Sequence, residues 1–207
     1  MKHVELVDRV YDRVKQMIFD QDLKPGEKIR QEKLAEKLGV SRSPLQKALQ
    51  RLESELLIES IPRRGVIVKE ISSKELIDVF ELRAVLEGLS ARLAASRLTS
   101  TQINKLKSCF EPFLSKTEID YDDYAKADRY FHDQIMKWSG NEVVTRLEVL
   151  SNVHMNAYQA GLFRAPEETL PEHFAIIEAL EKQDGNLAEK LMRNHIELSL
   201  DKLRNDK

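Results

Sequence analysis

The stretch from Glu32 to Leu57 constrains the fold most, because it reads as two short helices joined by a tight turn. Leucine and alanine recur at helical spacing before Gly39, and glycine readily takes the positive φ angle that ends a helix. Pro44 is tolerated only in the first turn of a helix, so a second helix begins nearby, with Ser41 or Ser43 as its cap. The pattern predicts a helix-turn-helix, a unit that reads the major groove of DNA in many proteins.

The second predicted helix separates apolar from polar side chains. Leu45, Leu49 and Leu52 recur at the spacing that holds one helix face on a core. The outward side chains near its start suit DNA, because arginine pairs with guanine, glutamine pairs with adenine, and serine or lysine holds phosphates. The candidate DNA-binding residues of this segment are Ser41, Arg42, Ser43, Gln46 and Lys47. A solvated helical hairpin is the alternative interpretation.

The segment that follows predicts a β-wing. Leu57 and Ile58 lead into Ile61–Val68, which reads as strand, basic turn and strand. The tip of this wing holds Arg63, Arg64 and Gly65, which would lie against phosphates or in the adjacent minor groove. An ordinary solvated hairpin is the alternative here.

Charge is distributed unevenly along the 207 residues. Residues 1–70 hold 15 Lys and Arg against 12 Asp and Glu, a net charge of +3, whereas the rest hold 18 against 23, a net charge of −5. The excess is small, so DNA affinity would depend on placing basic residues on one face and on doubling the site in a dimer. Since no apolar run nears the roughly 18 residues of a membrane span and no signal-peptide pattern is present, we expect a cytoplasmic protein with no membrane partner.

From residue 71 the sequence predicts helices only. Ser72 and Glu75 have the spacing of a capping box. The first helix carries an apolar stripe of Leu76, Val79, Phe80, Leu82, Val85, Leu86 and Leu89 and runs to about Leu98. Further helices are expected near residues 101–116, 120–138, 141–163, 167–182 and 186–204, with breaks at Gly140, Pro166 and Asp184–Gly185.

The fold class that follows is mainly α. We expect a winged helix-turn-helix DNA-binding domain with a small β-wing over residues 1–70. Residues 71–207 are expected to form an antiparallel bundle of about six helices.

Four polar residues of the predicted bundle lie on otherwise apolar helix faces. Asp128 and His132 are four residues apart and share one inward face. His173 and His195 lie on neighbouring helices, roughly 18 and 15 Å from the turn that joins them, so the two rings can meet. One carboxylate and three imidazoles suit a divalent metal such as zinc, nickel or manganese, with open positions for water or a ligand. Histidines that serve only core packing are the alternative.

The first third of the chain resembles the N-terminal domain of the GntR family of bacterial transcription regulators. The features that carry the resemblance are a leading helix, a Pro-Gly pair, the two-helix segment and the Arg-Gly wing, at Val7–Phe19, Pro25–Gly26, Leu34–Pro44 and Arg64–Gly65. Two departures stand out: Gln46–Lys47 replaces the family's usual Arg-Glu, and Leu56 replaces the Gly that usually precedes the wing. The missing arginine means that the operator sequence cannot be borrowed from relatives.

The second half resembles the effector-binding domain of the FadR-type branch of this family, and its modest length is similar to the VanR subgroup. The motifs are Glu81–Arg83 with Leu86–Glu87, Asp128 with Phe131–His132, Glu172–His173 with Ile176–Leu180, and Met192 with His195–Ile196. In metal-binding members an Asp and three His at these motif positions hold a divalent ion. The resemblance therefore implies Asp128, His132, His173 and His195 as metal ligands.

Arg83 stands in the family's Arg-x-x-x-Glu pattern, near the edge of the apolar stripe. An arginine close to a metal suits a carboxylate ligand, which implies a small organic acid as effector. A salt bridge with Glu87, one turn later, is the alternative role of Arg83.

The resemblance implies a homodimeric regulator, which we expect to be a repressor that binds a double-stranded operator under the control of the effector. A metal-dependent, hydrolase-like enzyme is the first alternative, although the chain lacks a His-Glu-x-x-His segment and a Gly-rich phosphate loop. An architectural DNA-binding protein without a ligand is the second.

Overall fold

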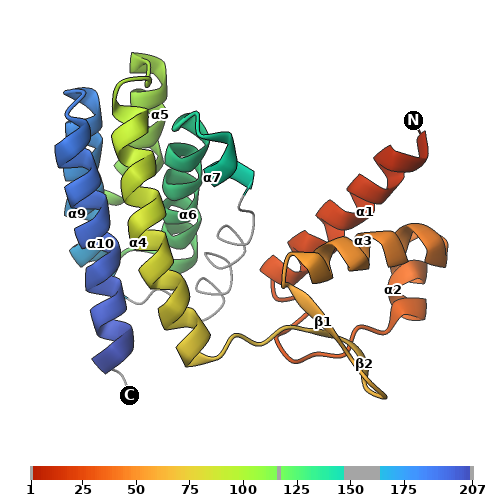
Figure 1. The fold of residues 1–207 in the computed structure, drawn as a ribbon. Coiled ribbons are helices and arrows are strands. Elements are labelled where there is room, and N and C mark those ends of the chain that lie inside the picture. Colours follow the sequence, from red (N-terminus) through yellow and green to blue (C-terminus); the bar gives the residue numbers. More distant parts are fainter. Residues whose placement is uncertain (1, 116–117, 147–163, 206–207) are drawn as a thin grey trace. The chain divides into compact units, whose positions relative to one another are not determined.

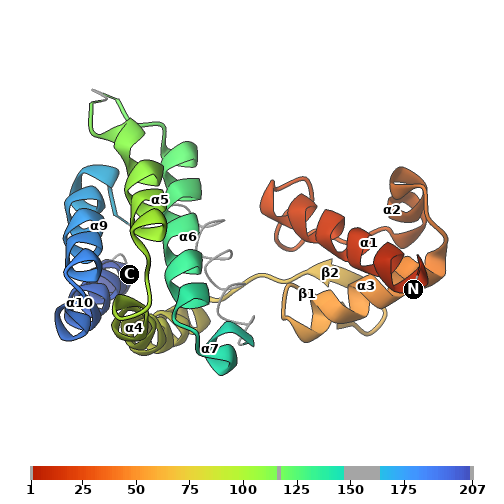
Figure 2. The ribbon, with the colours of Figure 1, turned by 90° about the horizontal axis from the view of Figure 1, so that it is seen from above.

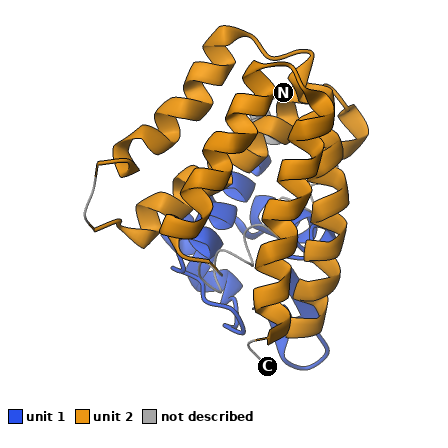
Figure 3. Ribbon diagram, turned by 90° about the vertical axis from the view of Figure 1, so that its left-hand side faces the viewer, with its two compact units in different colours: residues 1–71 blue, residues 72–207 orange. Residues whose placement is uncertain are grey.

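The computed structural model describes residues 2–115, 118–146 and 164–205 (Figure 1). The chain divides into two compact units, residues 1–71 and 72–207 (Figure 3). The fold class predicted from the sequence is confirmed, since the first unit is a winged helix-turn-helix and the second is helical. Among the residues described, no helix has both the length and the apolar character needed to cross a membrane.

The first unit contains three helices and a two-stranded sheet, and much of its apolar core comes from the first and third helices. Its elements are α1 Lys2–Phe19, α2 Gln31–Leu38, α3 Arg42–Ser54, β1 Ile58–Ile61 and β2 Gly65–Val68. Val14 and Ile18 of α1 and Leu45 and Leu52 of α3 are almost completely buried. The leucine face predicted for the second helix of the helix-turn-helix, which is α3, therefore does pack against the core.

The turn between α2 and α3 forms as the glycine predicted. Gly39 ends α2 with a φ of +65°, the left-handed conformation that glycine adopts without a steric penalty. Ser41 occupies the N-cap position of α3, but its hydroxyl makes no capping hydrogen bond, and Ser43 lies inside the first turn. The expected N-cap position is therefore confirmed for Ser41, whereas the capping hydrogen bond expected of a hydroxyl is absent, and both serines stay exposed at the start of the helix.

The wing is an antiparallel pair whose register runs from Ile58 opposite Val68 to Ile61 opposite Gly65. The outer edge of β2 is also paired, because Ile29 donates its backbone amide to the Val66 carbonyl and the Val68 amide donates to the Glu27 carbonyl, both over 2.9 Å. A short stretch before α2 thus covers β2 with a third piece of backbone.

One residue before the wing is held in an unfavourable backbone conformation. Leu56 has a φ of +60° and its side chain is 49% exposed. A left-handed conformation costs a side-chain-bearing residue about 1 to 2 kcal/mol. This is the position at which related regulators usually have glycine, and the structure shows why glycine suits it.

The second unit is built from helices that pack side by side (Figure 2). Its described elements are α4 Ser73–Ala95, α5 Ser100–Phe110, the short 3₁₀ helix η1 Glu111–Phe113, α6 Tyr121–Trp138, α7 Glu142–Arg146, α9 Pro166–Glu181 and α10 Gly185–Asn205. Helices α4 and α10 pack along their lengths, and α9 and α10 form a hairpin. The capping box of Ser72 and Glu75 is present at the start of α4.

Two predicted helices differ in extent from those observed. The helix expected over residues 101–116 ends at Phe110 and continues as η1, because Pro112 has no amide hydrogen to donate to the preceding turn. The helix expected over residues 141–163 is represented by α7 up to Arg146, and its remainder lies outside the described residues.

The apolar stripe expected on α4 is wrong in its centre. Leu82 and Val85 are 49% and 46% exposed, whereas Arg83 and Glu87 are buried. After Leu76 and Phe80, which are buried as expected, the buried face of α4 consists of that charged pair and of small residues: Ala84, Gly88, Ser90, Ala91, Ala94 and Ala95. Small side chains let α10 approach α4 closely, so size rather than hydrophobicity defines this face.

Gly185 has a different role from the one its place in the predicted turn suggests. The left-handed residue of the turn is Gln183, with a φ of +57°, whereas Gly185 begins α10. A Cβ atom at Gly185 would lie 2.9 Å from the backbone oxygen of Arg92 on α4. The glycine is needed for the close approach of two helices rather than for backbone freedom.

Candidate metal centre and nucleic-acid interface

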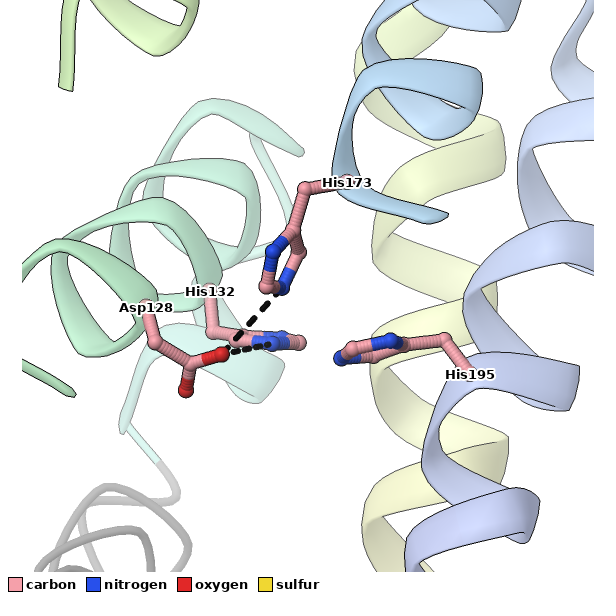
Figure 4. A group of neighbouring side chains, drawn as sticks. All are labelled: Asp128, His132, His173 and His195. Carbon is pink, nitrogen blue, oxygen red and sulfur yellow. Dashed lines mark ion pairs between the residues drawn. The ribbon is translucent and has the colours of Figure 1, made fainter. Parts of the chain in front are cut away.

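The four metal-ligand candidates predicted from the sequence come together in the interior of the second unit. Asp128 and His132 extend from α6, His173 from α9 and His195 from α10, and their side chains converge (Figure 4). One potential ligand atom from each residue lies within 4.8 Å of the others. Asp128 Oδ1 is 3.2 Å from His173 Nε2 and 3.9 Å from His132 Nε2.

Each imidazole of this cluster is held through its Nδ1 atom by a residue that the sequence did not single out for this role. His132 Nδ1 lies 2.5 Å from Glu87 Oε2. His195 Nδ1 lies 2.7 Å from Glu172 Oε2, and His173 Nδ1 lies 3.1 Å from the hydroxyl of Tyr124. The Nε2 atoms, on the other side of each ring, are left to face Asp128 and one another.

Burial and neighbouring charge shift the pKa values of the cluster in different directions. Burial lowers the pKa of His173 to about 3, and burial also lowers the pKa of His195 despite the nearby Glu172 carboxylate. For His132 burial acts in the same sense, but the Glu87 carboxylate outweighs it and raises the pKa. Burial would raise the pKa of Asp128, yet contact with His173 and the other imidazoles holds it below its usual range. At neutral pH His173 and His195 are therefore uncharged and Asp128 is ionised.

The donor set fits a divalent metal. His173 Nε2 is fully buried, and although Asp128 Oδ1 lies 3.2 Å away, the two atoms do not have hydrogen-bond geometry, so the ring nitrogen has no well-formed hydrogen bond to a described residue. Its ring stacks on Phe110, with the ring centroids 4.4 Å apart and the planes 10° apart, so the ring has little freedom to turn toward another partner. Three imidazole nitrogens, two of them on rings that burial keeps uncharged, and one carboxylate oxygen form a ligand set that zinc, nickel and manganese accept.

Arg83 lies deeper than the sequence suggested. It was expected near the edge of the apolar face of α4, but its side chain is only 6% exposed and its Nε donates to Glu87 Oε1 over 2.7 Å. The guanidinium also lies over the ring of Phe80, 4.6 Å from the centroid. The salt bridge considered for Arg83 and Glu87 is therefore present. Glu87 contacts Arg83 with one carboxylate oxygen and His132 with the other, so it links the two side chains.

The DNA-binding candidates of the first unit lie on one helix and one hairpin. Ser41, Arg42, Ser43, Gln46 and Lys47 are exposed on α3 or at its N-cap, and Arg63, Arg64 and Gly65 are exposed at the wing tip. Arg42, Gln46 and Gly65 line a common groove of about 460 Å³, so the start of α3 and the wing meet at one surface. Arg63 forms the tip with a φ of +65°.

Several residues of this groove were missed by the sequence reasoning. Lys28, Arg30 and Lys33 line it and add to its positive charge, and Glu32 lies among them. Glu32 Oε1 forms an exposed ion pair with Arg42 Nη2 at 2.5 Å. The excess of basic residues before residue 70 was the available signal for the three cations, but no spacing rule assigned them to the same face as Arg42.

Comparisons with known proteins agree with both units. The family model "Bacterial regulatory proteins, gntR family" matches residues 6–68, and the model "FCD domain" matches residues 78–198. The chain is 29% identical to the Glc operon transcriptional activator of Escherichia coli (strain K12), over 90% of this chain and 84% of that protein. It is 27% identical to the HTH-type transcriptional regulator YdhC of Bacillus subtilis, over 89% and 85%. The solved structure of E. coli McbR/YncC has the same fold, with a TM-score of 0.81 at 22% identity over 97% and 98% of the two chains.

Proposed function

Since this chain belongs to the gntR family of bacterial regulatory proteins and carries an FCD domain, we propose that it is a repressor whose DNA affinity is controlled by a small organic acid bound at a divalent metal. Like its curated relatives, which are transcriptional regulators, it is a DNA-binding transcriptional regulator and not an enzyme. The observation that carries the finer proposal is the buried cluster of Asp128, His132, His173 and His195.

The DNA-reading part of the proposal rests on α3 and the wing. In a homodimer, two copies of α3 would enter successive major grooves of a near-palindromic operator. Arg42 and Gln46 would read base edges, whereas Ser41, Ser43 and Lys47 would hold phosphates. Arg63, Arg64 and Gly65 would contact the backbone or the minor groove beside the helix. Operator DNA in a bacterium lies in the cytoplasm, which is where the protein would act.

The metal would be held by Asp128 Oδ1 and by the Nε2 atoms of His132, His173 and His195. A bound zinc, nickel or manganese ion would act as a Lewis acid, with coordination positions left for a carboxylate oxygen. The three imidazoles and the carboxylate come from α6, α9 and α10, so they connect three helices at one point. A ligand bound there can bias how these helices pack, which is the physical requirement for control at a distance.

Arg83 would assist in binding the acid. Its Nε is engaged by Glu87, and among the described residues its two terminal nitrogens have no hydrogen-bond partner. The fork of a guanidinium can therefore take carboxylate oxygens while Glu87 keeps its orientation fixed. We also propose that the chain belongs to the VanR-like subgroup, which its second half resembles in modest length and in an expected number of about six helices.

The first test measures metal content by elemental analysis of wild type and of the His173→Ala/His195→Ala double variant, both prepared without an affinity tag or chelator. The proposal predicts about one divalent ion per chain in wild type and loss of that ion in the variant. A library of small carboxylic acids is then screened for its effect on binding to operator DNA. No metal after incubation with zinc, nickel and manganese, together with a DNA affinity indifferent to acids, would instead indicate a ligand-independent architectural protein.

A further inference from the structure

Two of the three imidazoles of the metal centre point their Nδ1 atoms at carboxylates that arginines hold in place. Glu172 is bound on both oxygens by Arg164, with each nitrogen-to-oxygen distance 2.7 Å, and Glu172 Oε2 faces His195 Nδ1. An ionised carboxylate can only accept hydrogen bonds. His195 must therefore donate from Nδ1, which places its free lone pair on Nε2.

The same arrangement occurs at His132, on the opposite side of the cluster. Arg83 Nε donates to Glu87 Oε1, and Glu87 Oε2 accepts from His132 Nδ1. Glu87 and His132 are each only 1% exposed, so water has little access to replace this bond. Each histidine is thus bound by a glutamate that an arginine holds. The two glutamates come from different helices, α4 and α9, yet both accept from Nδ1 and leave Nε2 of the ring facing the cluster.

His173 is oriented by a chain of neutral groups that ends at an atom unable to donate. The hydroxyl of Thr169 donates to the backbone oxygen of Ala165 over 3.4 Å, so its own oxygen accepts from the hydroxyl of Tyr124 at 2.8 Å. The Tyr124 oxygen then accepts from His173 Nδ1 at 3.1 Å. With Thr169 donating to this carbonyl oxygen, which has no hydrogen of its own, each hydroxyl of the chain accepts from the group before it and His173 donates from Nδ1.

We infer that Glu87, Glu172 and Tyr124 are positioning residues that hold all three imidazoles in the Nδ1–H tautomer, so that three Nε2 lone pairs face the metal together. The inference rests on the proposed function of the cluster as a metal site. It also accounts for the geometry at the buried Nε2 of His173, which lies 3.2 Å from Asp128 Oδ1 without forming a hydrogen bond, because in this tautomer both atoms are acceptors that a cation between them would satisfy.

The first experiment determines the tautomers directly. Long-range ¹H–¹⁵N spectra of the full-length protein labelled with ¹⁵N-histidine are recorded at pH 8 without metal and after addition of zinc. The expected result is a protonated Nδ1 on His132, His173 and His195 in both states, with zinc bound to Nε2 in the second. Zinc bound through Nδ1, or an Nε2–H tautomer in the metal-free protein, would overturn the inference.

The second experiment removes one positioning residue at a time and measures zinc affinity with a competing chelator. Tyr124→Phe keeps the aromatic ring and removes only the hydroxyl, and Glu172→Gln keeps the shape of the side chain and removes its charge. Each is expected to weaken zinc binding roughly 10- to 100-fold, the usual effect of losing such a partner. Tyr124→Phe is also expected to give a mixture of His173 tautomers.

Matched controls lie on the same helices. Tyr121 is 53% exposed on α6 and the Glu178 side chain is 63% exposed on α9, so Tyr121→Phe and Glu178→Gln repeat the chemical changes away from the cluster. Unchanged zinc affinity in Tyr124→Phe and Glu172→Gln, or an equal loss in the controls, would refute the positioning role. If wild type binds no metal, the proposed metal site fails, while the tautomers of the metal-free protein still decide the inference separately.

Discussion

Two Arg-Glu ion pairs in this protein have similar geometry and opposite surroundings. In the first unit, Arg42 and Glu32 approach to 2.5 Å with side chains 72% and 78% exposed. In the second, Arg83 and Glu87 approach to 2.7 Å with side chains 6% and 1% exposed. Water competes for the first pair and screens it, so that pair contributes little to folding and can separate when DNA arrives. The second pair has no such competitor, and its members depend on one another.

The difference teaches where each unit can change without loss of structure. Exposed charges on α3 and the segment before it can be exchanged without loss of structure, because the fold does not rest on them. Buried charges around the cluster of Asp128, His132, His173 and His195 contact one another, and one pair of them lies on α4, which packs against α10 and α6. The predictions below test this contrast, in order of decreasing effect.

Arg83→Ala should cause the largest loss of stability. The substitution leaves Glu87 buried without its arginine, which typically costs about 3 to 5 kcal/mol. Urea unfolding of the metal-free protein measures the loss. The double variant Arg83→Met/Glu87→Gln removes both charges, keeps an amide oxygen that can accept from His132 Nδ1, and is expected to recover part of the loss. A single variant as stable as wild type would show that the pair is not coupled as its burial indicates.

Arg42→Ala should weaken operator binding and leave the fold intact. One specific arginine contact to a base is worth about 1 to 3 kcal/mol, whereas loss of an exposed ion pair costs at most about 1 kcal/mol of folding stability. Fluorescence anisotropy with operator DNA and a thermal melt of the same sample measure the two effects. Glu32→Ala serves as the control, because it breaks the same ion pair without removing the arginine. Operator binding that survives Arg42→Ala would contradict the assignment of α3 to the groove.

Acidification should destabilise the metal-free second unit through His173. Its pKa is about 3 in the folded protein, against an ordinary value of 6.5, so below pH 6.5 only the unfolded chain takes up the proton. Between pH 7.5 and 5 this residue should remove roughly 2 kcal/mol of stability. His132, whose pKa is raised, contributes in the opposite sense.

The comparison of wild type with His173→Gln isolates this contribution from that of His132. Urea unfolding at pH 7.5 and pH 5 should show a smaller loss of stability on acidification in the variant. Asp128, whose pKa lies below its usual range, also contributes stability that is lost on acidification. That loss begins only below about pH 4, outside the range from pH 7.5 to pH 5. An identical pH dependence in both proteins would contradict the prediction.

Leu56→Gly should stabilise the first unit by about 1 kcal/mol, because the φ of +60° at this position is strained for leucine and not for glycine. Denaturant unfolding measures the gain. Leu114 is also exposed but has a φ of −66°, so Leu114→Gly is the matched control and should not stabilise the protein. A loss of stability in Leu56→Gly would mean that contacts of the leucine outweigh the strain.

Sequence reasoning predicted the two kinds of unit and the four members of the buried cluster well. Asp128 and His132 could be paired because a spacing of four places side chains on one helix face, and His173 and His195 because a hairpin fixes their heights. These are local rules, and they hold when the helices are regular.

The residues around that cluster could not be predicted in the same way. Glu87 and Tyr124 lie 45 and 49 residues from the histidines they contact, so no spacing connects them. Arg83 was placed near the edge of an apolar stripe because leucine and valine flank it, but the close packing of α10 on α4 selects small residues and turns Leu82 and Val85 outward. Helix–helix distance is a tertiary property, and a hydrophobicity pattern does not contain it.

The stretch that covers the outer edge of β2 has a consequence for how molecules behave when crowded. An uncovered strand offers unpaired amides and carbonyls to any neighbouring chain, which favours edge-to-edge association and aggregation. In this wing Gly26, Glu27 and Ile29 occupy those groups on β2. Molecules brought close together along a chromosome thus meet with that strand already paired, which leaves fewer backbone groups through which they could stick to one another.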